Sequence, residues 1–93
     1  MFDFLKKLFS QKNLGKLRYK VISPGELIQE KYHNSTGYFF REEILTKGQQ
    51  PKGVYFIGGG DENIDVAYDI GLIGRLEIEK FIKSFGIEVE FIK

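Results

Sequence analysis

The stretch VYFIGGGDENIDVAYDIG, from Val54 to Gly71, decides the fold because three consecutive glycines separate two apolar runs. Residues 53–58, GVYFIG, have the composition of a short buried strand. After the glycines, apolar and polar side chains alternate over residues 63–70, which is typical of a strand with one solvated face. Glycine tolerates the positive φ that hairpin turns require. The stretch therefore predicts two antiparallel strands joined by a turn over residues 58–62.

The same glycines invite comparison with a phosphate-binding loop, and two features speak against it. Loops of that kind lead into a helix whose N-terminal N–H groups hold the phosphate, whereas this loop leads into a predicted strand. Neither G-x-G-x-x-G nor a following Gly-Lys-Ser/Thr is present, and Asp61 and Glu62 would repel a phosphate. We therefore expect no nucleotide and no other cofactor.

A calcium loop is the second chemical interpretation of this region. Asp61, Asn63 and Asp65 match the opening of an EF-hand loop. The match fails further along, because Val66 stands where the loop needs glycine and Leu72 where it needs a bidentate glutamate. A strand would also place the three side chains in a line rather than around an ion. No metal ligands are expected.

Hydrophobic periodicity predicts four further elements. They are strands over residues 16–23 and 87–93 and helices over residues 24–33 and 73–85. Ser23, Pro24 and Glu26 have the spacing of a capping box at the start of the first helix, with Leu27 and Ile28 facing the core.

The segment after that helix is harder to interpret. The sequence HNSTG predicts the helix end, because Asn34 and Gly37 both tolerate positive φ. Residues 38–45 are ambiguous: their aromatic enrichment favours a strand, while Phe40 and Ile44 have the spacing of a helical face. We favour the strand.

These elements predict a small single α+β domain over residues 1–93. We expect a mixed or mainly antiparallel sheet of four or five strands, with two helices covering one face. A possible N-terminal amphipathic arm covers residues 1–12, and the globular body covers residues 16–93. A chain of 93 residues with 42% hydrophobic content is enough for one core but only marginally stable, so self-association into a homodimer is compatible with it.

The composition removes several kinds of chemistry. The chain has no cysteine, which excludes disulfides, cysteine-ligated metals and thiol nucleophiles. His33 is the one histidine, so a Ser-His-Asp arrangement has a single candidate base, and we interpret His33 as a residue at a helix end. The carboxylate pairs Glu42–Glu43 and Glu88–Glu90 are expected on the surface. We expect no catalytic residues, no enzyme activity and a cytoplasmic location.

The first ten residues, MFDFLKKLFS, predict a short amphipathic helix with lysines opposite its apolar face. The segment is too short to span a bilayer. Residues 1–20 carry six basic and one acidic side chain, whereas residues 21–93 carry eight basic and twelve acidic ones. This basic segment either docks on the body, enters a groove on a partner protein, lies on an anionic membrane, or contacts nucleic acid.

The acidic side chains of the hairpin form a second candidate surface. Asp61, Asp65 and Asp69 are predicted on the solvated side of the second strand, near Glu62. A solubilising outer face is the more common explanation for such a pattern, and a contact surface for a basic partner is the functional alternative.

The leading hypothesis is a small non-catalytic protein-binding module, a regulator or inhibitor of a larger protein whose identity the sequence does not disclose. Its expected contact residues are Phe2, Phe4, Leu5, Lys6, Lys7, Phe9, Asp61, Glu62, Asp65 and Asp69. Two alternatives rank below it. One is a peripheral membrane protein anchored by the N-terminal helix. The other is a nucleic-acid binder using Lys12, Lys16, Arg18 and Lys20, which the net acidic body disfavours.

Overall fold

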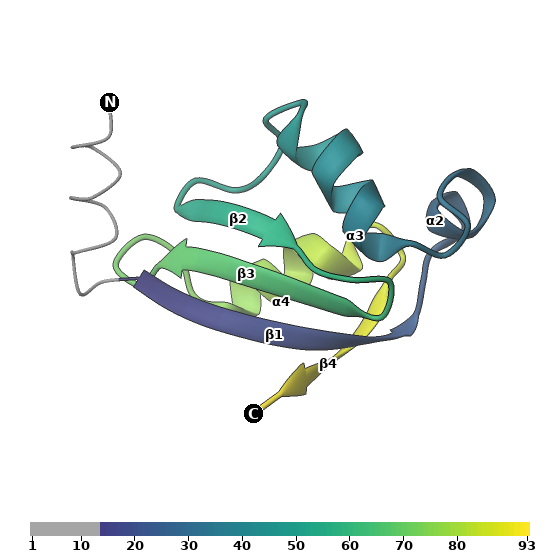
Figure 1. The fold of residues 1–93 in the computed structure, drawn as a ribbon. Coiled ribbons are helices and arrows are strands. Elements are labelled where there is room, and N and C mark those ends of the chain that lie inside the picture. The colour runs from purple at the N-terminus through teal and green to yellow at the C-terminus, as the bar shows by residue number, and fades with distance from the viewer. Residues whose placement is uncertain (1–13) are drawn as a thin grey trace.

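The computed structural model describes residues 14–93, apart from the Phe56 side chain, as four strands and four helical segments (Figure 1). In chain order these are β1 (Leu14–Ser23), α2 (Glu26–Lys31), α3 (Thr36–Phe39), the π-helix η1 (Phe40–Leu45), β2 (Val54–Gly58), β3 (Asn63–Asp69), α4 (Arg75–Lys83) and β4 (Glu88–Ile92). The predicted N-terminal helix lies outside the described residues, as do Phe2, Phe4, Leu5, Lys6, Lys7, Phe9 and Lys12. Their expected roles stay predictions.

The four strands form one antiparallel sheet in the order β2-β3-β1-β4. The predicted hairpin is confirmed, since β2 and β3 pair directly and Gly58 lies opposite Asp65. β1 adds on the other side of β3 with Tyr19 opposite Ile64, so that large apolar side chains of neighbouring strands share one face. The α+β class is confirmed, and the sheet is antiparallel rather than mixed.

Helices cover one face of this sheet. α4 lies behind the sheet in the view of Figure 1 and buries Ile78 and Ile82 in a core shared with Tyr19 and Ile64. α3 and η1 pack against β2, while α2 lies beyond the end of β1 and contributes Ile28 to the core (Figure 1). Of the two helices predicted to cover the sheet, therefore, only α4 lies across it.

The interpretation of residues 38–45 as a strand is wrong, because residues 36–45 are helical throughout. Phe39, Phe40 and Ile44 are all buried, and the rings of Phe39 and Phe40 lie 5.3 Å and 6.0 Å from the ring of Phe85. The aromatic enrichment thus reflects a helix that inserts two adjacent rings into the core. Adjacent apolar residues blur helical periodicity, and this favoured the strand interpretation.

The capping box predicted at Ser23 is also wrong. α2 starts at Glu26 with Gly25 as its N-cap and has no side-chain cap. Ser23 is still part of β1, where it pairs with Glu88 of β4. Tertiary pairing of the strand therefore overrides the local capping signal, and Leu27, which was expected to face the core, is 48% exposed.

The C-terminal half follows the prediction closely. α4 and β4 fall within the predicted ranges, and Glu88 and Glu90 face solvent as expected. The hydroxyl of Tyr19 donates to Glu79 of α4 at 2.9 Å, and Arg75 Nε donates to the same carboxylate oxygen at 2.7 Å. These bonds join α4 to the centre of the sheet. No helix within residues 14–93 is long and apolar enough to cross a membrane.

Candidate functional site

The acidic strip predicted on the hairpin is divided among three different surroundings. Asp65 forms an ion pair with Arg18, with 2.7 Å between Oδ1 and Nε. Asp69 accepts a hydrogen bond from the backbone N–H of Gly71 at 2.8 Å. Asp61 accepts a hydrogen bond from the hydroxyl of Ser35 at 2.7 Å, although Ser35 precedes it by 26 residues in the chain. Together with the exposed Glu62, these side chains do not make one continuous acidic surface.

The segment that Asp61 contacts begins with a strained turn. α2 ends at Lys31 with Tyr32 as its C-cap, and His33 and Asn34 then adopt consecutive positive φ values of 52° and 70°. The turn is held by backbone bonds, of which the N–H of Asn34 to the carbonyl of Ile28 is one, at 3.0 Å. Positive φ costs free energy for residues other than glycine and persists only where the surrounding structure imposes it, often near functional sites. Positive φ at Asn34 was expected; that at His33 was not.

The glycine loop packs directly on the start of α3. A Cβ added to Gly37 would lie 2.1 Å from the carbonyl oxygen of Gly59, and Gly59 itself has φ of +127°. No side chain can stand at either position without moving the backbone. The loop between β2 and β3 is therefore a hairpin turn, and its glycines also bring Asp61 beside Ser35. Gly37 acts through close approach, not through the positive φ expected of it.

Two hollows open where these segments meet. The first, about 410 Å³, is lined by Tyr32, His33, Ser35, Tyr38, Glu42 and Asp61, with Lys31 at its edge. The second, about 180 Å³, shares Ser35, Tyr38 and Asp61 with the first and adds Arg41 and the loop glycines. We call the two together the junction pocket. Tyr38 lines both hollows and is 60% exposed, a large fraction for an aromatic side chain.

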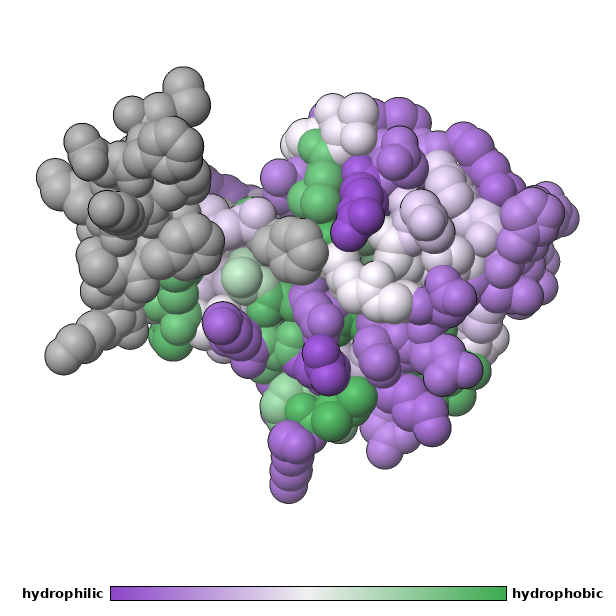
Figure 2. Space-filling view, viewed as in Figure 1, coloured by the Kyte–Doolittle hydropathy of each residue, from purple (hydrophilic) through white to green (hydrophobic). Residues whose placement is uncertain are grey.

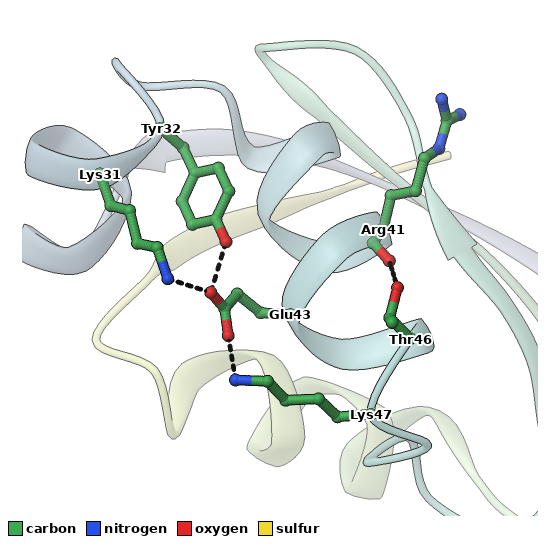
Figure 3. A network of polar contacts seen from close by, with 6 residues as sticks. All are labelled: Lys31, Tyr32, Arg41, Glu43, Thr46 and Lys47. Carbon is green, nitrogen blue, oxygen red and sulfur yellow. Dashed lines mark hydrogen bonds and ion pairs between the residues drawn. The ribbon is translucent and has the colours of Figure 1, made fainter.

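One wall of the junction pocket is fixed by a polar network around Glu43. Lys31 and Lys47 form ion pairs with its two carboxylate oxygens, and the hydroxyl of Tyr32 donates to it at 2.6 Å (Figure 3). Hydrogen bonds from Lys31, Lys47 and Tyr32 lower the pKa of Glu43 to about 2. The expectation that Glu43 is a plain surface residue is therefore wrong, because its side chain is only 16% exposed and joins α2 to η1.

The Glu43 network leaves other charged groups of the same helix free for the pocket. Figure 3 shows the Arg41 side chain pointing away from Glu43, and Arg41 lines the second hollow. Glu42 is exposed and lines the first hollow. Glu42 lines the first hollow and Arg41 the second, so these two successive residues bring opposite charges to the junction pocket.

The pocket contains a serine, a histidine and an aspartate, and their arrangement differs from that of a hydrolase. In a catalytic triad the histidine lies between the nucleophile and the carboxylate. Here the hydroxyl of Ser35 donates directly to Asp61. Within residues 14–93 no group of three or more metal-ligating side chains is close enough together to hold an ion. The pocket offers an aromatic ring, both charges and hydrogen-bonding groups, which suits recognition.

Of the basic side chains proposed to contact nucleic acid, the three within the described residues lie on the open face of the sheet. Lys16, Arg18 and Lys20 are exposed there, beside a hollow of about 580 Å³ that Arg18 and Asp65 help to line. Acidic side chains interrupt this row, since Asp65 pairs with Arg18 and Glu90 stands opposite Lys20 in register. The face therefore carries alternating charge rather than a basic stripe.

Sequence reasoning missed most of the junction pocket. Tyr32, Ser35, Tyr38, Arg41 and Glu42 were not singled out as site residues, and Asp61 was singled out for another reason. The signal that was present is the run HNSTG, whose residue types favour unusual backbone conformations and caps. Only the fold brings this run into contact with the glycine loop, because Ser35 and Asp61 are 26 residues apart in the chain.

Comparisons with protein-family models, with curated proteins and with solved structures find no match to this chain. What the structure defines is a class by architecture: a small α+β domain with a four-stranded antiparallel sheet and helices packed on one side.

Proposed function

We propose that this chain is a small non-catalytic protein-binding domain that contacts its partner through the junction pocket. The observation that carries the proposal is the exposure of Tyr38 in a concave site that also contains the acidic Glu42 and Asp61 and the basic Arg41. Tyrosine and arginine are enriched among the residues that dominate binding energy at protein interfaces.

The rigidity of the site supports the same proposal. The Glu43 network holds Tyr32, the close approach of Gly37 to Gly59 fixes the opposite wall, and the buried rings of Phe39 and Phe40 anchor the helix that carries Tyr38. A preformed surface loses little conformational entropy on binding, which raises affinity for a given area. A domain of this size would then regulate or inhibit a larger protein by occupying one of its surfaces.

The two alternatives have less support from the described residues. Nucleic-acid binding calls for a basic stripe, and acidic side chains are interleaved with the basic ones on the open face of the sheet. Membrane binding relies on residues 1–10, which lie outside the described part. Both remain as outcomes of the experiment below.

The test is affinity capture from nuclease-treated lysate with three versions of the full chain: the natural sequence, Tyr38→Ala and Tyr55→Ala. Tyr55 is the matched control, an exposed tyrosine on β2 that lines neither hollow. The proposal expects one stoichiometric protein with the natural chain and with Tyr55→Ala, and its loss with Tyr38→Ala. Equal capture by all three, or no protein captured, would contradict the proposal and turn attention to lipid and nucleic acid.

A further inference from the structure

A group of exposed apolar side chains lies in the connection between β3 and α4 and in the first turn of α4. Ile70, Leu72 and Leu76 are 58%, 54% and 72% exposed, and they fall within seven consecutive residues. The connection is well anchored, since Ile73 is buried and the N–H groups of Leu72 and Ile73 both donate to the carbonyl of Asp69, at 3.0 and 3.1 Å. Hydrophobic side chains are visible in Figure 2 at the end of the sheet where β1 begins. We call Ile70, Leu72 and Leu76 the apolar turn.

We propose that the apolar turn is the docking site of the chain's own N-terminal segment, residues 1–10. The first residue of β1, Leu14, pairs with Asp69, the last residue of β3, so the chain leaves the sheet directly beside Ile70. A ten-residue helix is about 15 Å long, and the three residues 11–13 can span roughly 10 Å. The segment can therefore reach the apolar turn without disturbing any described element.

The two surfaces are complementary in character. Phe2, Leu5 and Phe9 recur at the spacing of one helical face, and the apolar turn presents three branched aliphatic side chains. In a helix Lys6 flanks this apolar face, while Asp69 and the exposed Glu77 border the turn. A contact between these surfaces buries apolar area on both and places opposite charges at its margin.

The tether favours this occupant over a second copy or a lipid surface. A segment joined by a short linker is present at an effective concentration in the millimolar range, so even weak contacts keep it bound. An anionic membrane, by contrast, usually requires a second attachment signal besides one short basic helix. The inference goes beyond the proposed function, since the apolar turn and the junction pocket lie at opposite ends of β3, which runs from Asn63 beside the glycine loop to Asp69.

A tryptophan reporter tests the docking. The chain contains no tryptophan, so Phe9→Trp in the full chain gives a single emitter on the segment. The test variant adds Leu72→Lys and Leu76→Lys, and the matched control adds Ile22→Lys and Leu27→Lys, two similarly exposed apolar residues outside the turn. We expect blue-shifted emission and protection from acrylamide quenching in the reporter and the control, and loss of both in the test variant. The protection should not change with protein concentration.

Three results would overturn the proposal. They are water-exposed emission in the reporter itself, protection that the two lysines in the turn leave intact, and protection that grows with concentration, which would indicate a second copy. Leu76→Lys alone serves as a second variant, because Leu76 is the most exposed residue of the turn and its replacement leaves Leu72 in place. Thermal unfolding of each variant shows that loss of protection is not loss of the fold.

Discussion

Gly37 and Gly59 touch backbone to backbone: the carbonyl oxygen of Gly59 occupies the space that a Cβ on Gly37 would need, at 2.1 Å. This contact joins the start of α3 to the hairpin turn and holds Ser35 beside Asp61. It links the fold to the proposed site, because the junction pocket exists only while the two segments stay together.

Replacing Gly37 by alanine should therefore destabilise the protein. The added methyl group would meet rigid backbone, and overpacking of that kind costs about 1–3 kcal/mol. Gly60→Ala is the matched control, since a Cβ there meets nothing within 4 Å, and its effect should stay within about 0.5 kcal/mol. Urea unfolding of both variants measures the difference. Equal stabilities would show that the contact between Gly37 and Gly59 is not tight.

Relieving the backbone strain at His33 should, by contrast, stabilise the protein. Left-handed backbone costs a residue with a Cβ about 1–2 kcal/mol, and glycine adds roughly 0.4–1 kcal/mol of unfolded-state entropy. With φ of 52° at this position, His33→Gly should stabilise the protein by about 0.5–1 kcal/mol. His33→Ala keeps the strain and should change little. A destabilised glycine variant, measured by urea unfolding, would mean that the imidazole makes a favourable contact.

The bond between Tyr19 and Glu79 should contribute measurably to the attachment of α4. Tyr19 is buried, its hydroxyl donates to a carboxylate at 2.9 Å, and burial together with this bond raises its pKa. Tyr19→Phe should cost about 1.5–3 kcal/mol, the range for a hydrogen bond to a charged group. Tyr55→Phe is the control, because the hydrogen bond from the Tyr55 hydroxyl to Asp69 is exposed and 3.5 Å long. Its loss should leave the free energy of unfolding near that of the natural chain.

The raised pKa of Tyr19 also predicts a loss of stability in alkali. Because its pKa is higher in the folded than in the unfolded protein, the stabilisation is fully present below the ordinary value of 10.0 and declines as pH rises above it. Tyr19→Phe should lack this part of the decline. Unfolding free energies measured across alkaline pH for both proteins check the sign, and parallel curves would contradict it.

The lowered pKa of Glu43 predicts a loss of stability in acid. Its pKa falls from the ordinary 4.5 to about 2 in the folded protein, so its contribution is present above pH 4.5 and is lost as pH falls through about 2. Glu43→Gln should be less stable than the natural chain at neutral pH, and the difference should shrink over that interval. Glu42→Gln is the adjacent exposed control. A difference that is the same at pH 6 and pH 2.5 would show that the charge of Glu43 is not the cause.

The parts of the fold that the sequence predicted are those with local signals. Strict alternation in β3 and β4 and the glycines between β2 and β3 specify strands and a turn without reference to the rest of the chain. α3 and η1 were missed because Phe39 and Phe40 are adjacent, and two neighbouring core rings do not look like one helical face. The capping box failed because Ser23 pairs with Glu88 across the sheet.

The junction pocket could not be predicted for a related reason. It joins residues 31–42 to residues 59–61, and no periodicity or spacing connects these two segments. What brings them together is the absence of side chains at Gly37 and Gly59, whose importance depends on the distance between two backbones. The sequence grouped Asp61 with Asp65 and Asp69, whereas in the fold Asp61 contacts Ser35, Asp65 pairs with Arg18 and Asp69 accepts from Gly71.

The most direct test of the junction pocket as a protein-binding site is amide chemical-shift mapping. The isotope-labelled full chain would be titrated with the protein that it captures. We expect the largest shifts, and line broadening, within residues 33–42 and 58–61, and a Tyr38→Ala chain that needs on the order of 30-fold more partner, which corresponds to about 2 kcal/mol. Shifts concentrated instead on residues 70–76 or on β4, with Tyr38→Ala binding as tightly as the natural chain, would contradict the account.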